Sequence, residues 1–281
     1  MLSYCHSFHA GNQADVFKHA LLFAFLSMYT EKAKPFTAFD VHAGHGVYNL
    51  TDADSIKTGE AYNGIIHLLT SYQSKTLPEP IPEYFEKYLV FCKTNYEQQG
   101  VYYGSPALSY SFLDDSSHLI ACELHPAAAA ALKSRYKGIK NVHVHKRDGY
   151  ETVLALSPPH PVRGFAFFDP SYELDSDYIN VIETIKKLHK RWFAGSFIIW
   201  YPIVARKAAQ TADLKHGLAC INGTDMLTLE VPHKIIGQNT VDTGYGLRGS
   251  GMCIINPPWG FEKKATAIAE YLGRLQEAVE V

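Results

Sequence analysis

The tetrapeptide Asp169-Pro170-Ser171-Tyr172 contains the residue types that alkylation of an aromatic amine requires. The lone pair of such an amine is delocalised into the ring, so hydrogen-bond acceptors must draw its N–H groups out of the ring plane. Asp169 supplies a carboxylate and Pro170 a backbone carbonyl, while the ring of Tyr172 can stack on a base. A plain turn is the alternative, because Asp-Pro often begins turns. Its position directly after an apolar run favours the chemical role.

Three further segments place small or acidic residues directly after an apolar run. Gly44 and Gly46 let the backbone turn tightly beside a ligand, although a connecting turn needs the same glycines. Glu123 stands where a carboxylate can bind ribose hydroxyls, or it caps the next helix. Asp148, before Gly149, has the same two interpretations. Together these segments predict a site for an adenosine without a pyrophosphate, and so for S-adenosylmethionine.

Short apolar runs and helical patterns alternate along the chain. Buried strands are predicted at 36–41, 119–122, 142–145, 165–168, 197–200, 227–231 and 252–255. Helices are predicted at 12–34, 126–136, 150–156, 178–192, 203–216 and 262–280. The first of these has the spacing of an amphipathic helix. This alternation predicts an α/β fold with a doubly wound, mostly parallel, seven-stranded Rossmann-like sheet, whose ligand lies beyond the carboxyl ends of the strands.

The segment between Gly46 and Leu119 shows no convincing strand. It has about seventy residues, whereas a crossover between parallel strands needs only a dozen or more. Helical patterns at 62–72 and 82–99 predict a small helical insertion there. We therefore expect one core formed by residues 1–49 and 105–281, with an inserted helical subdomain at residues 50–104.

The composition excludes several classes of protein. A chain of 281 residues with 47% hydrophobic residues can bury a sizeable core, which excludes a disordered chain and a disulfide-stapled mini-protein. The five cysteines are scattered and odd in number, so we expect reduced thiols in a cytoplasmic protein. Neither a signal peptide nor an apolar run of about 18 residues is visible, so we expect no contact with a membrane. The formal net charge of -2 gives no overall positive field for a nucleic acid.

Over essentially its whole length the chain resembles the bacterial ribosomal RNA large subunit methyltransferase J family, which is a class I S-adenosylmethionine-dependent family. The most specific similarity is the N-terminal block Tyr4-x-His6-x-Phe8-His9-Ala10-Gly11-Asn12-x-Ala14-Asp15-Val16-x-Lys18-His19. It continues in the motifs Asp40-x-His42-Ala43-Gly44, Tyr103-Gly104-Ser105-Pro106, Glu123-Leu124-His125-Pro126, Asp148-Gly149, Trp200-Tyr201-Pro202 and Asn256-Pro257-Pro258-Trp259. The resemblance implies methylation of N6 of an adenine in 23S rRNA, and a small helical insertion after the first strand.

The resemblance also implies roles for single residues. The residues expected to bind the cofactor are His19, His42, Gly44, Ser105, Glu123, Asp148, Gly149 and Asp169. Among them, Ser105 would contact the methionine end and Glu123 the ribose hydroxyls. Asp169, Pro170 and Tyr172 would be catalytic, and the residues expected to bind the substrate adenosine are Tyr4, Lys18 and Tyr172. Residues 1–20 would form a segment that closes over the cofactor and the substrate.

One departure from the family concerns the catalytic tetrapeptide, which is usually Asp-Pro-Pro-Tyr. Ser171 stands at its third position, and the loss of this proline frees one backbone φ next to Tyr172. A catalytically weakened RNA-binding relative therefore stays an alternative, as does a DNA adenine-N6 methyltransferase. An NAD-linked oxidoreductase is more distant, because Asn49 replaces the third glycine of the pyrophosphate pattern.

The segment Asn256-Pro257-Pro258-Trp259 fits an amine-methylating tetrapeptide at least as well, letter for letter. It follows the last predicted strand, which runs antiparallel in methyltransferase sheets. Its end should therefore point away from the cofactor. We predict a structural turn at this place.

The remaining polar residues bear on partners. The 14 histidines do not show the convergent spacing of a metal site, so we expect no metal. Basic residues cluster locally at 133–140, 143–147 and 186–191. Each cluster is either a solvated face or, where it lines one rim of the site, a place that holds RNA phosphates despite the near-neutral total charge. We expect a monomer whose partner is free or protein-poor 23S rRNA.

Overall fold

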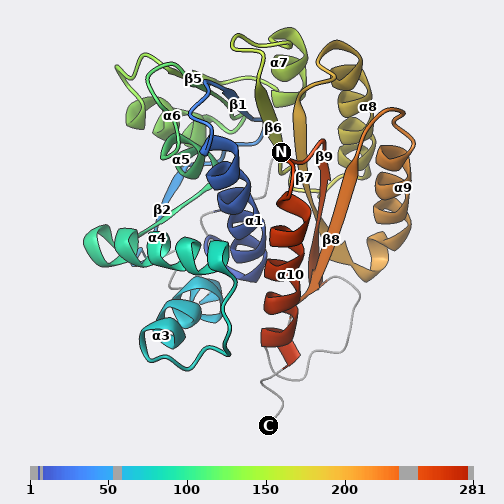
Figure 1. Ribbon diagram of the computed structural model, residues 1–281. Helices are drawn as coiled ribbons and strands as arrows, with labels where there is room; N and C mark the ends of the chain where they lie inside the picture. Colours follow the sequence, from blue (N-terminus) through green and yellow to red (C-terminus); the bar gives the residue numbers. More distant parts are fainter. Residues whose placement is uncertain (1–5, 7–8, 53–58, 234–245, 278–281) are drawn as a thin grey trace.

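The computed structural model describes residues 6, 9–52, 59–233 and 246–277, and its centre is a seven-stranded sheet (Figure 1). The strand order is β5-β4-β1-β6-β7-β9-β8. β9 alone runs in the direction opposite to that of the other six strands. The predicted doubly wound, mostly parallel sheet is confirmed. Its strands are β1 (Thr37–Asp40), β4 (His118–Cys122), β5 (Val142–His145), β6 (Gly164–Phe168), β7 (Ser196–Val204), β8 (Met226–Pro232) and β9 (Leu247–Ile255).

Helices cover both faces of this sheet, as Figure 1 shows. α1, α5 and α10 pack together on one face, while α7, α8 and α9 pack on the other, and α6 follows β4 to the edge strand β5. The helices are α1 (Gln13–Thr30), α5 (Ser105–Tyr110), α6 (Pro126–Arg135), α7 (Gly149–Ala155), α8 (Asp175–Arg191), α9 (Ala208–Ala219) and α10 (Phe261–Glu277). Because both faces are covered, every residue of β1 and β6 is buried.

The first helix differs from its prediction. α1 ends at Thr30, before the predicted limit of residue 34, and the helix is not amphipathic. All residues from Ala14 to Leu26 are buried. The reason is tertiary: α1 packs against α10, α5 and the inserted helix α4 (Glu83–Gln99), which leaves it no solvent-exposed face along this stretch.

The inserted region contains strands that the sequence did not reveal. β2 (Val47–Asn49) and β3 (Val101–Tyr103) pair antiparallel and join the two ends of this region, so the expectation of no strand between Gly46 and Leu119 is wrong. Strands of three residues are too short to show a period-two pattern. Between them lie the predicted helices, as η2 (Tyr62–Ile66), α3 (His67–Gln73) and α4. The division into a core and residues 50–104 stays a prediction.

Two boundaries on the far side of the sheet also differ. α9 begins at Ala208, not at residue 203, because β7 continues to Val204 and a short η3 turn (Ala205–Lys207) follows it. β9 begins at Leu247, which pairs with Val204. β7 and β9 therefore stabilise each other along their extra length, and no local sequence pattern predicts this effect.

Candidate active site

Carboxylates gather at the carboxyl edge of the sheet, at or just after the ends of neighbouring strands. Asp40 is the last residue of β1, Glu123 follows β4, Asp148 follows β5 and Asp169 follows β6. Because β1 lies between β4 and β6 in the sheet, the residues that follow these strands meet at one edge. The structure thus brings together the strand ends singled out in the sequence, and it adds Asp40 to them.

Glu123 fixes the glycine turn after β1. Its Oε2 accepts a hydrogen bond from the backbone N–H of Gly44 at 2.8 Å, and its Oε1 accepts one from the backbone N–H of His125 at 2.6 Å. Gly44 has a φ of 58°, and a Cβ at this position would collide with the hydroxyl of Tyr48. Glu123 therefore does not act as the N-cap of α6, a position that His125 occupies. Glycine is required at position 44 for both conformation and space.

Asp40 has a buried carboxylate, and the neighbouring Ser105 side chain and His42 backbone offset the effect of its burial only in part. The residue is 1% exposed, and neither carboxylate oxygen has a hydrogen-bond partner within the described residues. Burial raises the pKa of Asp40 to about 7, against the opposing effect of the nearby Ser105 side chain, and the charges of Asp169 and Glu123 add to the rise. A buried carboxylate of this kind needs a cationic or donor group. The amino group of a bound amino-acid moiety would fit this requirement.

Asp40 was not among the site residues predicted from the sequence, although it lies in the motif Asp40-x-His42-Ala43-Gly44. The available signal was an acidic residue at the last position of an otherwise apolar strand, shortly before the glycine turn. Ser105, which was predicted as a site residue, is 5% exposed and begins α5 close to this carboxylate.

Asp148 and Gly149 join β5 to α7. Asp148 is the N-cap of α7, and its Oδ1 accepts a hydrogen bond from the backbone N–H of Glu151 at 2.9 Å. In this structure the Asp148 side chain therefore caps α7. A contact of Asp148 with adenine stays a prediction. A Cβ at Gly149 would collide with the carbonyl oxygen of Val41, so only glycine lets α7 begin this close to the end of β1.

Asp169 is held by two neighbours. Its Oδ2 accepts a hydrogen bond from Lys18 Nζ at 2.7 Å, and its backbone N–H donates to His42 Nδ1 at 3.3 Å. Burial lowers the pKa of His42 to about 3, so this imidazole is neutral at pH 7 and its Nδ1 is an acceptor. The ring of Tyr150 lies 4.9 Å from that of His42. Lys18 thus contacts the carboxylate of the predicted catalytic residue, and His42 contacts its backbone.

Tyr172 is fixed in a buried position. It is 4% exposed, and its hydroxyl donates to the carbonyl oxygen of Trp200 at 2.7 Å. Its ring lies 4.6 Å from that of Tyr178, and its φ of 54° places it in the left-handed region. These contacts hold the residue although Ser171 replaces the family's proline. Stacking of Tyr172 on a base stays a prediction.

His19 belongs to a buried chain of hydrogen bonds that reaches into the inserted region. The residue is 2% exposed, and its Nδ1 lies 2.6 Å from the hydroxyl of Tyr102 on β3. That hydroxyl lies 2.9 Å from the hydroxyl of Tyr88 on α4. Burial lowers the pKa of His19 to about 3, which keeps it neutral. A contact of His19 with the cofactor stays a prediction, and both tyrosines were missed in the sequence.

The inserted region also holds the start of α1. Glu60 accepts hydrogen bonds from His9 Nδ1 at 2.8 Å and from Asn12 Nδ2 at 2.9 Å. The backbone N–H of Ile65 donates to the carbonyl oxygen of Gly11 at 2.8 Å. Tyr4, expected to bind substrate, lies outside the described residues.

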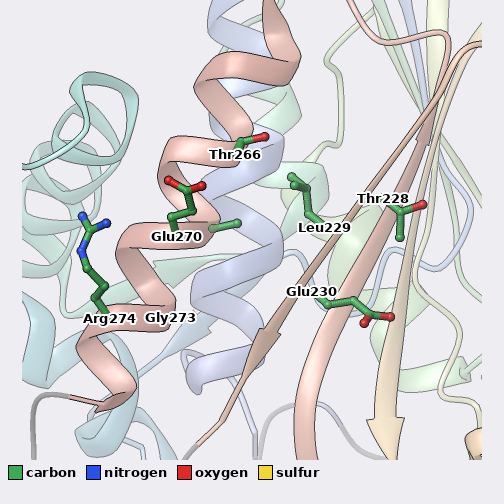
Figure 2. A pocket seen from close by; sticks show the side chains of 8 residues that line it. Thr228, Leu229, Glu230, Thr266, Glu270, Gly273 and Arg274 are labelled. Atoms are coloured by element: carbon green, nitrogen blue, oxygen red, sulfur yellow. The ribbon is translucent and has the colours of Figure 1, made fainter.

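Figure 2 shows a pocket elsewhere on the molecule, between α10 and the edge strand β8. It has a volume of about 450 Å³, and its lining residues are Thr228, Leu229, Glu230, Thr266, Ala269, Glu270, Gly273 and Arg274. None of these belongs to the carboxyl edge of β1, β4, β5 or β6. Glu230 Oε1 already accepts from Tyr201 and Lys215, each at 2.8 Å. This pocket is separate from the candidate active site.

The described residues contain no cluster of three His, Cys, Asp or Glu side chains able to hold a metal ion. No helix among them is long and apolar enough to cross a membrane.

Comparison with known proteins identifies the family. The sequence model of the family described as ribosomal RNA large subunit methyltransferase D, RlmJ, matches residues 33–279. The chain belongs to the RlmJ family. Two relatives are named ribosomal RNA large subunit methyltransferase J. The one from Haemophilus influenzae is 37% identical over 97% of this chain and 93% of its own, and the one from Escherichia coli is 34% identical over the same shares.

A solved structure supports the fold of this RlmJ-family chain. The crystal structure of a protein from Legionella pneumophila superposes with a TM-score of 0.82 at 29% sequence identity. The match covers 96% of this chain and 95% of that protein. The two proteins therefore share their fold over nearly the full length of both chains. The predicted Rossmann-like class I methyltransferase fold is confirmed.

Proposed function

We propose that this RlmJ-family chain transfers a methyl group from S-adenosylmethionine to N6 of an adenine in 23S rRNA. The names of its relatives support methylation of large-subunit rRNA. The adenine-N6 specificity is supported by the Asp-Pro-x-Tyr tetrapeptide, whose acceptors suit an exocyclic aromatic amine. The observation that carries the proposal is the position of Asp169: it follows β6, directly beside the end of β1 with the buried Asp40.

The residues of the carboxyl edge fit S-adenosylmethionine. Asp40 offers a buried carboxylate to the amino group of the methionine moiety, next to Ser105. Glu123, at the turn of Gly44, would accept hydrogen bonds from the ribose hydroxyls. Gly149 leaves room beside the end of β1. When bound, the cofactor supplies a methyl group that its sulfonium makes electrophilic.

Asp169 and the Pro170 carbonyl would then orient the target amine. Both accept hydrogen bonds, and together they turn the amine lone pair toward the methyl group. His42 fixes the backbone of Asp169 through its neutral Nδ1, which keeps this carboxylate at the strand end. An adenine must be unstacked to reach it, which favours a single-stranded or loop adenosine.

The finer points of the proposal concern partners and location. We propose free or protein-poor 23S rRNA as substrate, a monomer as the active form and the cytoplasm as location. The four cysteines among the described residues are all unpaired thiols, which is consistent with a reducing compartment.

The test is methylation with labelled S-adenosylmethionine, protein-free 23S rRNA or duplex DNA, and nucleoside mass spectrometry. We expect N6-methyladenosine in rRNA only. Asp169→Asn should abolish turnover and retain cofactor binding, while Asp213→Asn, a change at an exposed carboxylate on α9, should leave both unchanged. Label in DNA alone would contradict the rRNA substrate. Undetectable turnover by the wild type on unmodified rRNA would instead support a weakened RNA-binding relative.

A further inference from the structure

Asp15 is a buried carboxylate in the first turn of α1 to which neither the sequence motifs nor the proposed chemistry assigns a role. It is 0% exposed. Its Oδ2 accepts from the backbone N–H of Gly11 at 2.8 Å and lies 3.1 Å from His6 Nε2, and its Oδ1 lies 2.8 Å from Lys18 Nζ. Burial alone would raise the pKa of Asp15, but His6 and Lys18 hold it well below its usual range. The Asp15 carboxylate is therefore ionised.

Lys18 lies between two carboxylates. Its side chain is 4% exposed, and its Nζ is 2.7 Å from Asp169 Oδ2 as well as 2.8 Å from Asp15 Oδ1. The ring of Trp200 lies 5.2 Å from the same Nζ. Lys18 therefore shares its ammonium charge between the carboxylates of Asp15 and Asp169.

This charge balance matters for methylation of an amine. Transfer of the methyl group would form the N–C bond as the sulfonium S–C bond breaks, so the positive charge passes from sulfur to the target nitrogen until that nitrogen loses one of its two protons. A negative group beside the nitrogen stabilises this charge. A pair of Lys18 and Asp169 alone would be neutral and would give little such stabilisation. The ammonium would also compete with the target amine for Asp169. Release of a buried ammonium from its only carboxylate is costly, so a second carboxylate lowers this cost.

We propose that Asp15 is a positioning residue for methyl transfer, which acts through Lys18 and leaves the Asp169 carboxylate available to the target amine. This inference rests on the proposed function of Asp169 as the amine acceptor. Asp15 itself touches neither the substrate nor the cofactor in this scheme. It takes up the charge of Lys18, and it holds the backbone of Gly11 at the same time.

The test is a double-mutant cycle on single-turnover methylation of 23S rRNA. Asp15→Asn keeps the shape of the side chain and an acceptor for Gly11, but removes the charge. We expect it to lower the rate by about tenfold to a hundredfold. The dissociation constant for S-adenosylmethionine should change by less than about twofold. In a Lys18→Met background the same change should alter the rate by less than about twofold, because the partner through which Asp15 acts is gone.

Two further variants separate charge from structure. Glu60→Gln removes the charged acceptor of His9 and Asn12, which weakens the hold on the start of α1 but leaves Lys18 untouched. We expect it to retain the single-turnover rate within about threefold. Asp15→Glu keeps a charge near Lys18 and should retain more activity than Asp15→Asn, which keeps the proposal testable if the latter folds poorly.

Several outcomes would overturn the proposal. Equal losses from Asp15→Asn with and without Lys18, or a loss from Glu60→Gln as large as that from Asp15→Asn, would mean that Asp15 only holds the N-terminal segment. An unchanged rate for Asp15→Asn, or equal losses for Asp15→Glu and Asp15→Asn, would also contradict it. Failure of the proposed function looks different, because the wild type would then form no N6-methyladenosine in 23S rRNA.

Discussion

Two tetrapeptides of nearly the same pattern lie at opposite edges of one sheet. Asp169-Pro170-Ser171-Tyr172 follows the parallel strand β6, whereas the segment from Asn256 to Trp259 follows β9, which runs antiparallel to its neighbours. The second therefore ends at the amino edge, where the side-chain amide of Asn256 donates to the carbonyls of Phe193 at 2.9 Å and Gly195 at 3.0 Å. The structural turn predicted there is confirmed.

Both segments contain a residue with a positive φ, but their side chains differ in burial and in hydrogen bonding. Tyr172 has a φ of 54° and Asn256 a φ of 51°, both in the left-handed region. Tyr172 is 4% exposed and packs beside the site, while Trp259 is 98% exposed. Asp169 shares its charge with a buried lysine, whereas both amide hydrogens of Asn256 are taken up by backbone carbonyls. Strand direction, and not the letters of the motif, decides which segment can do chemistry.

The largest effect is expected at the first segment. Asp169→Asn should lower single-turnover methylation of 23S rRNA by about a hundredfold or more, because an amide is a much weaker acceptor for the target amine. Asn256→Asp, which gives the second segment an aspartate at the position that corresponds to Asp169, should leave the rate unchanged. The same change should not rescue the rate of Asp169→Asn. Radiolabel transfer at saturating cofactor measures all three variants. Rescue by Asn256→Asp would show that the second segment can also hold the target amine, which contradicts a role for strand direction.

Asp40→Asn should separate binding from stability at the carboxyl edge. The pKa of about 7 lies above the ordinary 3.8 of this group, so the folded state holds a proton that the unfolded state loses. Folding stability therefore falls as the pH rises from about 4 to about 7, by roughly 1.4 kcal/mol per unit of pKa difference at most. The variant should lose cofactor affinity by at least about tenfold and yet melt higher than the wild type at pH 8 without cofactor.

The measurement is thermal melting of wild type and Asp40→Asn between pH 5 and 8.5, together with cofactor titration. The difference between the two melting temperatures should grow up to about pH 7 and then stay constant. Taking the difference removes the titration of His19 and His42, which both proteins share. A constant difference over the whole range would contradict a raised pKa at Asp40.

At the amino edge we expect an effect on stability alone. Asn256→Ala removes two hydrogen bonds to backbone carbonyls and places alanine at a positive φ, which should lower the free energy of unfolding by about 1–3 kcal/mol. Urea denaturation measures this, and the methylation rate of the folded enzyme should not change. Asn256→Gly loses the same bonds without the strain, so it should be less destabilised than Asn256→Ala. Equal losses would mean that φ is unimportant there.

The smallest effect is expected for Trp259→Ala. The side chain is 98% exposed, so its removal should change the free energy of unfolding by less than about 0.5 kcal/mol. Cofactor affinity and the methylation rate should also stay at the wild-type level. Urea denaturation and the labelled-cofactor assay check both statements. A loss of methylation would show that the amino edge takes part in the reaction.

Some strands of the sheet could be predicted from the sequence, and others could not. β1 and β6 are short apolar runs whose ends carry Asp40 and Asp169, and both strands are visible because full burial demands apolar side chains. β2 and β3 were missed, since strands of three residues have no detectable period and pair only because the inserted region must close. The extra length of β7 and β9 likewise comes from their pairing with each other.

The candidate site shows the same division. The sequence pointed to Glu123, Asp148 and Asp169 through their positions after apolar runs. It could not show that the Asp148 side chain caps α7, because an aspartate at this position is expected both for a helix cap and for a ligand contact. Nor could it show that Tyr88 and Tyr102 of the inserted region hold His19, since those contacts join segments far apart in the chain.

Local sequence patterns were enough to predict the fold class, the strand ends that carry the acidic residues and the tetrapeptide able to hold an amine. These depend on local periodicity and on residue type, which are properties of short segments. The folded structure was needed to show that Lys18 joins Asp15 to Asp169, that α1 is buried on all sides from Ala14 to Leu26, and that the Asp40 carboxylate is buried. Burial and charge pairing depend on residues brought together from distant segments, so they exist only once the chain has folded.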